Sequence, residues 1–329
     1  MEERRELKFK IQCFNPEVDE EPHFKNYNVE LEQGITILRT INYIKDHIDS
    51  TLTMRFFCQA GICGSCAVKV NGVSKLACTT QVWDELDGCE EEGTVVIEPL
   101  NNFKIIRDLV VDIDPMIQKL KNHKTWAVPD KPHDEIGDKE YAISDEEFQR
   151  INPATDCILC ASCYSECSIM EVSQGFISPL VMLKTFRMND DRRDTLNMDR
   201  LETANRDGGI WDCTHCYRCV EVCVKNIPIM DAIQGLRHES LKKGFDDSDG
   251  ARHAFAFQTD IESGSGRLRE FTLPLRTLGP IGSLKQIPFA LTMGMKGRVP
   301  PIFPHKAKDH GNLKRMIFNA RKEQEENKD

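Results

Sequence analysis

Apolar and polar residues alternate at the beginning of the chain, and such alternation is typical of strands with one buried face. It predicts strands over residues 8–14 and 27–32, which are rich in β-branched and aromatic residues. Between residues 37 and 48 the apolar positions instead recur at helical spacing, which predicts a helix with an apolar stripe. The run TVVIEPL at 94–100 predicts a closing strand. We therefore expect a compact α+β sheet wrapped on one helix.

The middle of the chain is predicted to be helical. Helical periodicity covers residues 108–126, and it returns around the cysteines from residue 148 onward. Ser178 and Pro179 are typical of a helix start, as N-cap and first-turn residue. The acidic, proline-containing stretch between the helical regions has no clear period, which favours a linker. The expected parts are an α+β domain at 1–107, a helix and acidic linker at 108–147, a helical domain at 148–245 and a basic extension at 246–329.

The last of these parts is basic and rich in apolar residues. Residues 271–308 contain six basic residues and no acid, together with many Gly and Pro residues. Two interpretations remain open. The segment is either a tail that covers its own domain, or an arm that docks a partner near anionic lipid.

The composition of the chain limits the classes of function that fit it. A net charge of −10 over 329 residues provides no basic field for nucleic acid, so we expect no nucleic-acid partner. No apolar run approaches the roughly 20 residues that span a bilayer, and the first residues contain neither an apolar signal region nor a twin-arginine motif. Fourteen cysteines are many for such a chain, and their tight spacing suits metal ligation better than disulfides.

Four cysteines have the spacing of a plant-type [2Fe–2S] site. A C-x4-C-x2-C run is followed, after eleven residues, by a fourth cysteine. Gly61 and Gly64 let the backbone wrap closely and point N–H groups at sulfur, and Asn71-Gly72 predicts a hairpin that returns the fourth cysteine to the loop. A structural zinc loop is the alternative, although zinc sites rarely use this spacing. The expected ligands are Cys58, Cys63, Cys66 and Cys78.

Two later runs share the spacing C-x2-C-x2-C-x3-C, which is typical of a two-cluster ferredoxin. In that arrangement three cysteines of one run hold one cubane and the fourth holds the other, so the repeat crosslinks itself through iron. Two zinc ribbons are the alternative, but eight thiolates in such runs fit cubanes better. The expected [4Fe–4S] ligand sets are Cys157, Cys160, Cys163 and Cys223, and Cys167, Cys213, Cys216 and Cys219.

The remaining residues point to electron transfer without catalysis. Cys13 and Cys89 are left over and are expected to be structural or incidental. His215, inside the second run, either tunes a cluster by hydrogen bonding or is a spacer. The chain has no G-x-G-x-x-G fingerprint and no evident catalytic residues, so a flavin or NAD site is expected on another chain. Three clusters in one chain predict a path for single electrons.

The order of these motifs resembles the iron–sulfur subunit of succinate dehydrogenase and fumarate reductase over about residues 8–240. FFCQAGICGSCAVKVNGVSKLACTT is similar to the N-terminal signature of that family, and CILCASCYSEC to its first C-terminal one. GFISPLVMLKTFRMNDDRRD resembles the stretch between the two cysteine runs. The resemblance implies a β-grasp N-terminal domain, a helical C-terminal domain and a flavoprotein partner with covalent FAD. It also implies that [2Fe–2S] lies nearest the flavin and that a membrane partner is quinone-linked.

The sequence departs from the usual pattern of the family in three ways, and in these it resembles a divergent branch of the family. Most members lack a cysteine at the position of Cys216 and hold [3Fe–4S], so here we expect a second [4Fe–4S]. Ser168 and Val224 stand where the family usually has proline, after Cys167 and Cys223. SIMEVSQGF lacks the tryptophans that the common enzymes place beside the quinone. In this branch the membrane partner is a cysteine-rich subunit related to heterodisulfide reductase, and the basic extension is our candidate for its docking site.

Two other functions fit the same motifs. The first is an electron-transfer subunit of another flavin enzyme, either glycolate oxidase-like or a thiol-linked fumarate reductase. The second is a free electron carrier. For the main interpretation we expect a location on the cytoplasmic face of the cell membrane, peripheral to it. The periplasmic face is the alternative if a signal-bearing partner exports the chain.

Overall fold

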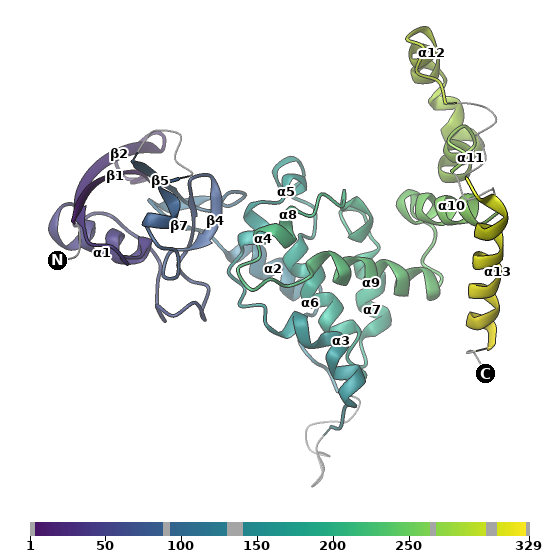
Figure 1. The fold of residues 1–329 in the computed structure, drawn as a ribbon, viewed down its shortest axis with the longest axis horizontal. Coiled ribbons are helices and arrows are strands. Elements are labelled where there is room, and N and C mark those ends of the chain that lie inside the picture. Colours follow the sequence, from purple (N-terminus) through teal and green to yellow (C-terminus); the bar gives the residue numbers. More distant parts are fainter. Residues whose placement is uncertain (1–3, 88–92, 130–140, 264–267, 301–307, 327–329) are drawn as a thin grey trace. The chain divides into compact units, whose positions relative to one another are not determined.

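The computed structural model describes residues 4–87, 93–129, 141–263, 268–300 and 308–326. The chain divides into two compact units, a first unit of residues 1–236 and a second unit of residues 237–329 (Figure 1). Cys89 and residues 130–140 of the predicted acidic linker lie outside the described residues. All fourteen cysteines belong to the first unit.

A five-stranded sheet forms the N-terminal domain of the first unit (Figure 1). β1 (Arg5–Cys13) pairs antiparallel with β2 (His23–Leu31) and parallel with β5 (Thr94–Glu98). β5 also pairs with β3 (Ala67–Val70), which forms a hairpin with β4 (Val73–Leu76). The strand order is therefore β2-β1-β5-β3-β4. This mixed sheet is the expected β-grasp arrangement, and the predicted strands are confirmed.

One helix, α1 (Ile37–His47), packs on this sheet and fills the core of the domain. Its side chains Leu38, Ile41 and Ile44 are almost fully buried, as the helical spacing of apolar residues predicted. The Thr36 hydroxyl accepts the N–H of Arg39 and so caps the first turn.

The hairpin between β3 and β4 turns at Asn71-Gly72, as predicted. Both residues have positive φ, +48° and +77°, which is typical of a type I′ turn. The Asn71 side chain fixes the turn, because it donates to the Glu85 carbonyl at 2.8 Å and accepts the Val96 N–H at 2.9 Å. The hairpin therefore returns the chain toward the loop that carries the first cysteines.

Helices around α6 (Pro179–Asn189) fill the rest of the first unit. α6 begins as predicted, because the Ser178 hydroxyl accepts the N–H of Val181 at 3.4 Å and proline takes the first turn. Val181 and Met182 are buried, so this helix belongs to the core. The other elements are η1 (Trp83–Glu85), β6 (Ile105–Arg107), β7 (Val110–Val111), α2 (Asp114–Asn122), α3 (Asp145–Thr155), α4 (Ser162–Ser165), α5 (Ser168–Val172), α7 (Asn197–Ala204), η3 (Ile210–Asp212), α8 (Arg218–Glu221) and the first part of α9 (Ile229–Lys242).

The helix predicted over residues 108–126 was wrong at both ends, because only Asp114–Asn122 is helical. The Asp108 carboxylate accepts the N–H of Phe14 at 3.0 Å and that of Thr53 at 2.9 Å. These bonds hold the chain against the N-terminal domain in a left-handed turn at Asp108, φ +45°. A helix cannot pass through that turn, so it starts later.

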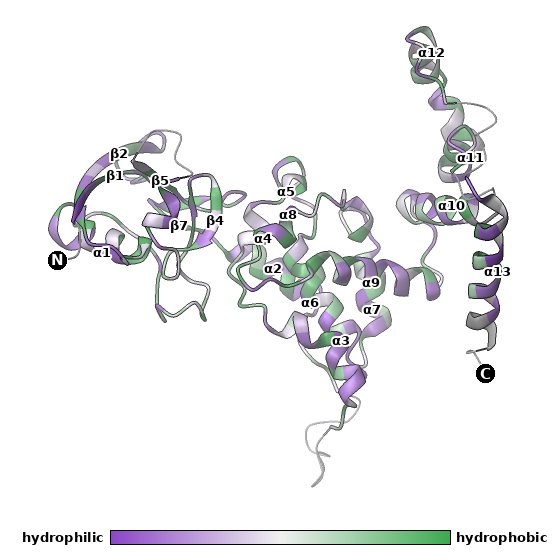
Figure 2. Cartoon of the chain, in the orientation of Figure 1, coloured by the Kyte–Doolittle hydropathy of each residue, from purple (hydrophilic) through white to green (hydrophobic). Residues whose placement is uncertain are grey.

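The second unit is helical as well. Its elements after α9 are α10 (Asp249–Ser263), α11 (Leu273–Lys285), α12 (Ile287–Met295) and α13 (His310–Glu326). α10 packs on α11, where Asp260 and Arg276 form an ion pair at 2.6 Å. α11 kinks at Gly279, φ +68°, which precedes a proline. Hydrophobic residues occur along both α11 and α12 (Figure 2). No described helix is long and apolar enough to cross a membrane.

Candidate iron–sulfur sites

The first cysteine loop directs backbone N–H groups at its own sulfur atoms. The Cys58 Sγ accepts N–H groups from Ala60 at 3.4 Å, Ile62 at 3.3 Å and Cys63 at 3.2 Å. The Gly61 N–H donates to the Cys78 Sγ at 3.3 Å and so joins the loop to the residue after the hairpin. N–H groups aimed at sulfur favour the thiolate and are what a plant-type cluster needs from its loop.

The thiols of this loop differ in acidity. The Ser65 hydroxyl, followed by the backbone N–H of Cys58, lowers the pKa of the Cys63 thiol to about 6. Burial raises the pKa of the Cys66 thiol to about 12. A buried thiolate requires compensating positive charge, which iron ions supply when a cluster is bound. The donor set therefore fits an iron–sulfur cluster.

Gly64 brings the first loop into contact with the next cysteine run. It has φ +71°, and a Cβ there would lie 2.8 Å from the Ile158 carbonyl oxygen and 2.9 Å from the Cys160 Cα. A cavity of about 280 Å³ beside this contact is lined by Cys63 on one side and Cys160 on the other. The two predicted cluster sites are therefore direct neighbours. The sequence assigned Gly64 only to the wrapping of its own loop.

The two later runs fold alike, residue for residue. Leu159 and its counterpart His215 both have φ +56°, and Ala161 and Tyr217 have φ +65° and +63°. A short helix follows in each case, α4 and α8, and the two helices pack together. The sequence repeat is thus also a repeat of backbone conformation.

The fourth cysteine of each later run interacts electrostatically with cysteines of the other run, as the predicted ligand sets require. Burial raises the pKa of Cys167, and the charges of Cys216 and Cys213, both in the other run, raise it further. Burial likewise raises the pKa of Cys160, and Cys223 contributes to that rise. The predicted ligand sets remain a prediction, but the structure brings these thiols near one another.

Thiols of one later run lie close enough to those of the other to interact electrostatically. Among the described residues, no group of three or more His, Cys, Asp or Glu side chains is placed to hold a single metal ion. Cys163 also interacts with Cys219 of the other run, so the two predicted cubane sites adjoin.

Three polar contacts to these cysteines have no marker in the sequence. The Lys184 Nζ donates to the Cys157 carbonyl at 3.1 Å, and the Cys160 Sγ lies 3.4 Å from the Ser162 hydroxyl. The N–H of Ile227 donates to the Cys223 Sγ at 3.3 Å. The contacts of Lys184 and Ile227 come from residues outside the cysteine runs and depend on how the chain folds around them. Ser162 lies within the first run.

Glu166 joins the two domains of the first unit. Its Oε1 accepts both the N–H of Ser74 at 3.0 Å and the Ser74 hydroxyl at 2.6 Å. Its Oε2 accepts from Arg218 in α8 at 3.4 Å. One carboxylate therefore holds the β3–β4 hairpin, the first run and the second run together.

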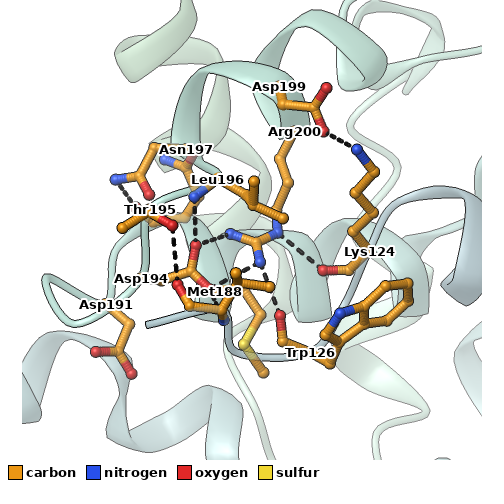
Figure 3. A network of polar contacts seen from close by, with 12 residues as sticks. Lys124, Trp126, Met188, Asp191, Asp194, Thr195, Leu196, Asn197, Asp199 and Arg200 are labelled. Atoms are coloured by element: carbon orange, nitrogen blue, oxygen red, sulfur yellow. Dashed lines mark hydrogen bonds and ion pairs between the residues drawn. The ribbon is translucent and has the colours of Figure 1, made fainter. Parts of the chain in front are cut away.

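A buried ion pair stabilises the helical domain behind the cysteine runs (Figure 3). Arg200 and Asp194 are fully buried and meet at 2.5 Å. Arg200 also donates to the carbonyls of Lys124 at 2.9 Å and Trp126 at 2.8 Å. Burial alone would raise the pKa of Asp194, but Arg200 and the backbone N–H groups of Val128 and Leu196 together outweigh it, so the pKa lies below its usual value. The pair thus holds the segment after α2 against the segment that precedes α7.

Comparisons with known proteins agree with both cysteine patterns. Residues 8–118 match the family described as 2Fe-2S iron-sulfur cluster binding domain, and residues 153–227 match the 4Fe-4S dicluster domain. The chain is 36% identical over 320 residues to the 8-methylmenaquinol:fumarate reductase iron-sulfur subunit of Wolinella succinogenes, covering 96% of this chain and 98% of that protein. It is 37% identical over 226 residues to the fumarate reductase iron-sulfur subunit of Mycobacterium tuberculosis, covering 68% of this chain and 88% of that one.

The fold is also that of a solved structure. A chain of the Mycobacterium smegmatis Sdh1 complex in the apo form aligns with a TM-score of 0.65 at 24% identity, covering 74% of this chain and 99% of that chain. The fold and its cysteine runs define an iron–sulfur electron-transfer protein. The chain belongs to the family of succinate dehydrogenase and fumarate reductase iron–sulfur subunits, which confirms the resemblance, the α+β fold class and the role in electron transfer.

Proposed function

We propose that this chain carries single electrons between a flavoprotein with covalent FAD, where fumarate and succinate are interconverted, and a quinone-linked partner at the membrane. Iron–sulfur clusters take up and release one electron at a time with little rearrangement. The contact of Gly64 with Cys160 carries the proposal, because it places the first cysteine loop directly against the first of the two later runs. The proposed electron path therefore runs from the first loop through the first of the two later runs.

The proposed ligands are the twelve cysteines of the three sites. The N–H groups around Cys58 and the buried thiols of the later runs support iron–sulfur clusters at these positions. The [2Fe–2S] ligands are Cys58, Cys63, Cys66 and Cys78. The [4Fe–4S] ligands are Cys157, Cys160, Cys163 and Cys223 for one cluster, and Cys167, Cys213, Cys216 and Cys219 for the other.

The flavoprotein would dock at the first loop. Phe57 is 82% exposed, and Ile62 is exposed as well, on either side of Cys58. Large apolar side chains left in water mark interaction surfaces, particularly when they lie together. A partner covering them would come close to the [2Fe–2S] site, in agreement with the order implied by the family resemblance.

The membrane partner is proposed to be a cysteine-rich subunit related to heterodisulfide reductase. Cys216 supports this branch, since it would complete the four thiols of the second proposed cubane, and it is exposed. The match to the Wolinella succinogenes subunit covers 96% of the chain and therefore reaches into the C-terminal extension. That relative's name supports a menaquinol as donor and fumarate as acceptor. The complex would lie peripherally on the cytoplasmic face of the membrane.

The first test is the metal content of anaerobically prepared protein. We expect about ten irons per chain with matching sulfide. Zinc in their place, or far fewer irons, would contradict the three-cluster assignment.

The second test is activity of the complex. We expect a flavoprotein to co-purify, and the complex to reduce a dye with succinate or to oxidise a reduced dye with fumarate. A monomer that purifies without a flavoprotein would instead indicate a free carrier. A flavoprotein complex inactive with both acids would indicate a subunit of another flavin enzyme.

A further inference from the structure

Helix α12 is almost entirely apolar, yet it contains no buried residue. Phe289 is 63% exposed and Leu291 is 64% exposed. Residues two positions apart on an α-helix are separated by about 200° around its axis, so these two side chains point to opposite sides. Ile281 and Leu284, at the end of α11, are exposed as well. We call residues 281–299 the apolar tip. A helix that is apolar on every side normally lies in a protein core or in a membrane.

Both hydroxyl groups of the apolar tip donate to backbone carbonyls of the tip or of the turn before it. The Thr292 hydroxyl donates to the Pro288 carbonyl at 2.9 Å, and the Ser283 hydroxyl donates to the Gly279 carbonyl at 2.8 Å. At the end of α12 the N–H of Arg298 donates to the Met293 carbonyl at 2.9 Å. Backbone and hydroxyl groups must be paired in this way where hydrocarbon replaces water.

Positive charge flanks the apolar residues. Lys285 lies before α12, and Lys296 and Arg298 lie after it; all three are exposed and none forms an ion pair within the described parts of the chain. No acid occurs between residues 271 and 308, although the whole chain has a net charge of −10. This local reversal of charge complements an anionic surface, and anionic lipid attracts Lys and Arg next to an apolar segment.

We propose that the apolar tip inserts into the interfacial region of an anionic bilayer and anchors the chain there. At about 1.5 Å per residue, the nine residues of α12 reach only about half of the roughly 30 Å hydrocarbon core. The helix therefore lies in the interface and does not span the membrane. The basic residues that flank α12 favour anionic lipid as the occupant, because they complement its negative surface. The proposal deepens, and rests on, the membrane-linked function proposed above.

The test is flotation of the cluster-loaded full-length chain with phosphatidylcholine vesicles, with and without phosphatidylglycerol. We expect the wild-type chain to float with the anionic vesicles. Phe289→Glu with Leu291→Glu should weaken binding at least about tenfold. Lys285→Gln with Lys296→Gln and Arg298→Gln should remove the preference for phosphatidylglycerol.

The matched control is Met316→Glu with Phe318→Glu on α13, where both side chains are 68% exposed. This variant should float like the wild type, and all variants should keep their cluster absorbance. Failure of the wild-type chain to float, or equal loss in the control variant, overturns the proposal. Normal flotation of the tip variant, with loss of the membrane subunit in detergent, also overturns it and makes the tip a protein-docking site. Dye reduction in detergent measures the proposed function independently of these results.

Discussion

At the scale of single residues, two positions in the cysteine sites should be sensitive to substitution. One matters for its thiol and the other for its backbone conformation. Cys216 is the exposed member of the second run, while Cys219 three residues later is buried. Gly64 has a backbone conformation that disfavours side chains, and it lies against another segment. We therefore expect the Cys216 thiol to determine the type of the second cluster, and the absence of a side chain at Gly64 allows the close contact with Cys160.

Cys216→Ser should convert the second cubane to [3Fe–4S]. A hydroxyl is a much poorer iron ligand than a thiolate, so the iron held by this corner is expected to leave. Oxidised protein should then show the [3Fe–4S] resonance, with roughly one iron fewer per chain. Cys13→Ser is the control, because Cys13 is buried in β1 away from the loop and should leave iron content unchanged. A wild-type chain that already shows this resonance at full occupancy would refute the assignment.

Gly64→Ala should destabilise the first unit by about 2–4 kcal/mol. It combines left-handed strain with overlap on the Ile158 carbonyl and Cys160. Gly72→Ala is the matched control, since it has φ +77° but nothing within 4 Å of an added Cβ, so it should cost only about 1–2 kcal/mol. The midpoints of anaerobic thermal unfolding compare the two. Equal midpoints would show that the loops do not pack as described.

At the scale of elements, the helices that surround the cysteine runs are joined by buried polar groups. Arg200 and Asp194 fasten the chain after α2 to the start of α7 (Figure 3). His123, at the C-terminal end of α2, is also buried. Burial, followed by the charges of Lys119 and Arg206, lowers the pKa of His123 to about 4. The packing of these helices therefore depends on one charged pair and one neutral imidazole.

Arg200→Met should lower stability by about 3–5 kcal/mol, because it leaves the Asp194 carboxylate buried without its partner. Arg206→Met is the control: Arg206 forms an exposed pair with Glu202, and such pairs contribute about 0–1 kcal/mol. Thermal unfolding of the two variants measures the difference. Similar midpoints would mean that the buried pair adds no more than a surface pair.

Stability should fall as the pH drops from about 6.5 toward 4, in part because of His123. The unfolded chain takes up a proton near pH 6.5, whereas the folded one does so only near pH 4, so acid favours unfolding. His123→Gln should flatten this part of the stability curve, measured by thermal unfolding at several pH values. His23, which is exposed on β2, offers a control in His23→Gln. An unchanged slope in His123→Gln would show that this imidazole is not the group responsible.

At the scale of the whole molecule, the first unit joins the N-terminal sheet domain and the helical domain, and it carries the cysteines of all three proposed sites. Glu166 binds Ser74 of the N-terminal domain and Arg218 of the second run. Gly64 and Cys160 touch across the same boundary. The second unit contains no cysteine and presents the apolar tip. Electron transfer thus belongs to the first unit and the proposed membrane contact to the second.

Glu166→Ala should loosen the boundary between the two domains. Charge-assisted hydrogen bonds contribute about 1.5–3 kcal/mol, and this carboxylate is largely buried. We expect a lower unfolding midpoint and loss of [2Fe–2S] absorbance at a different temperature from the cubanes. Glu221→Ala is the matched control, because Glu221 also pairs with Arg218 but is exposed. Simultaneous loss of all clusters in Glu166→Ala would contradict this account.

The sequence by itself determined the cysteine patterns, the α+β class, the turn at Asn71-Gly72 and the start of α6. These features are local, since cluster loops, turns and caps are set by residues a few positions apart. Its prediction of a helix from residue 108 failed because the hydrogen bonds of Asp108 reach Phe14 and Thr53, far away in the chain.

Only the tertiary structure decided how the local parts meet. It placed Gly64 against Cys160, Glu166 between two domains, and Cys167 beside thiols of the other run. It also left α12 without a buried residue. Such contacts join segments that are distant in sequence, so no spacing of residue types announces them. They form only when the burial of apolar surface and the pairing of polar groups are satisfied together for the whole unit.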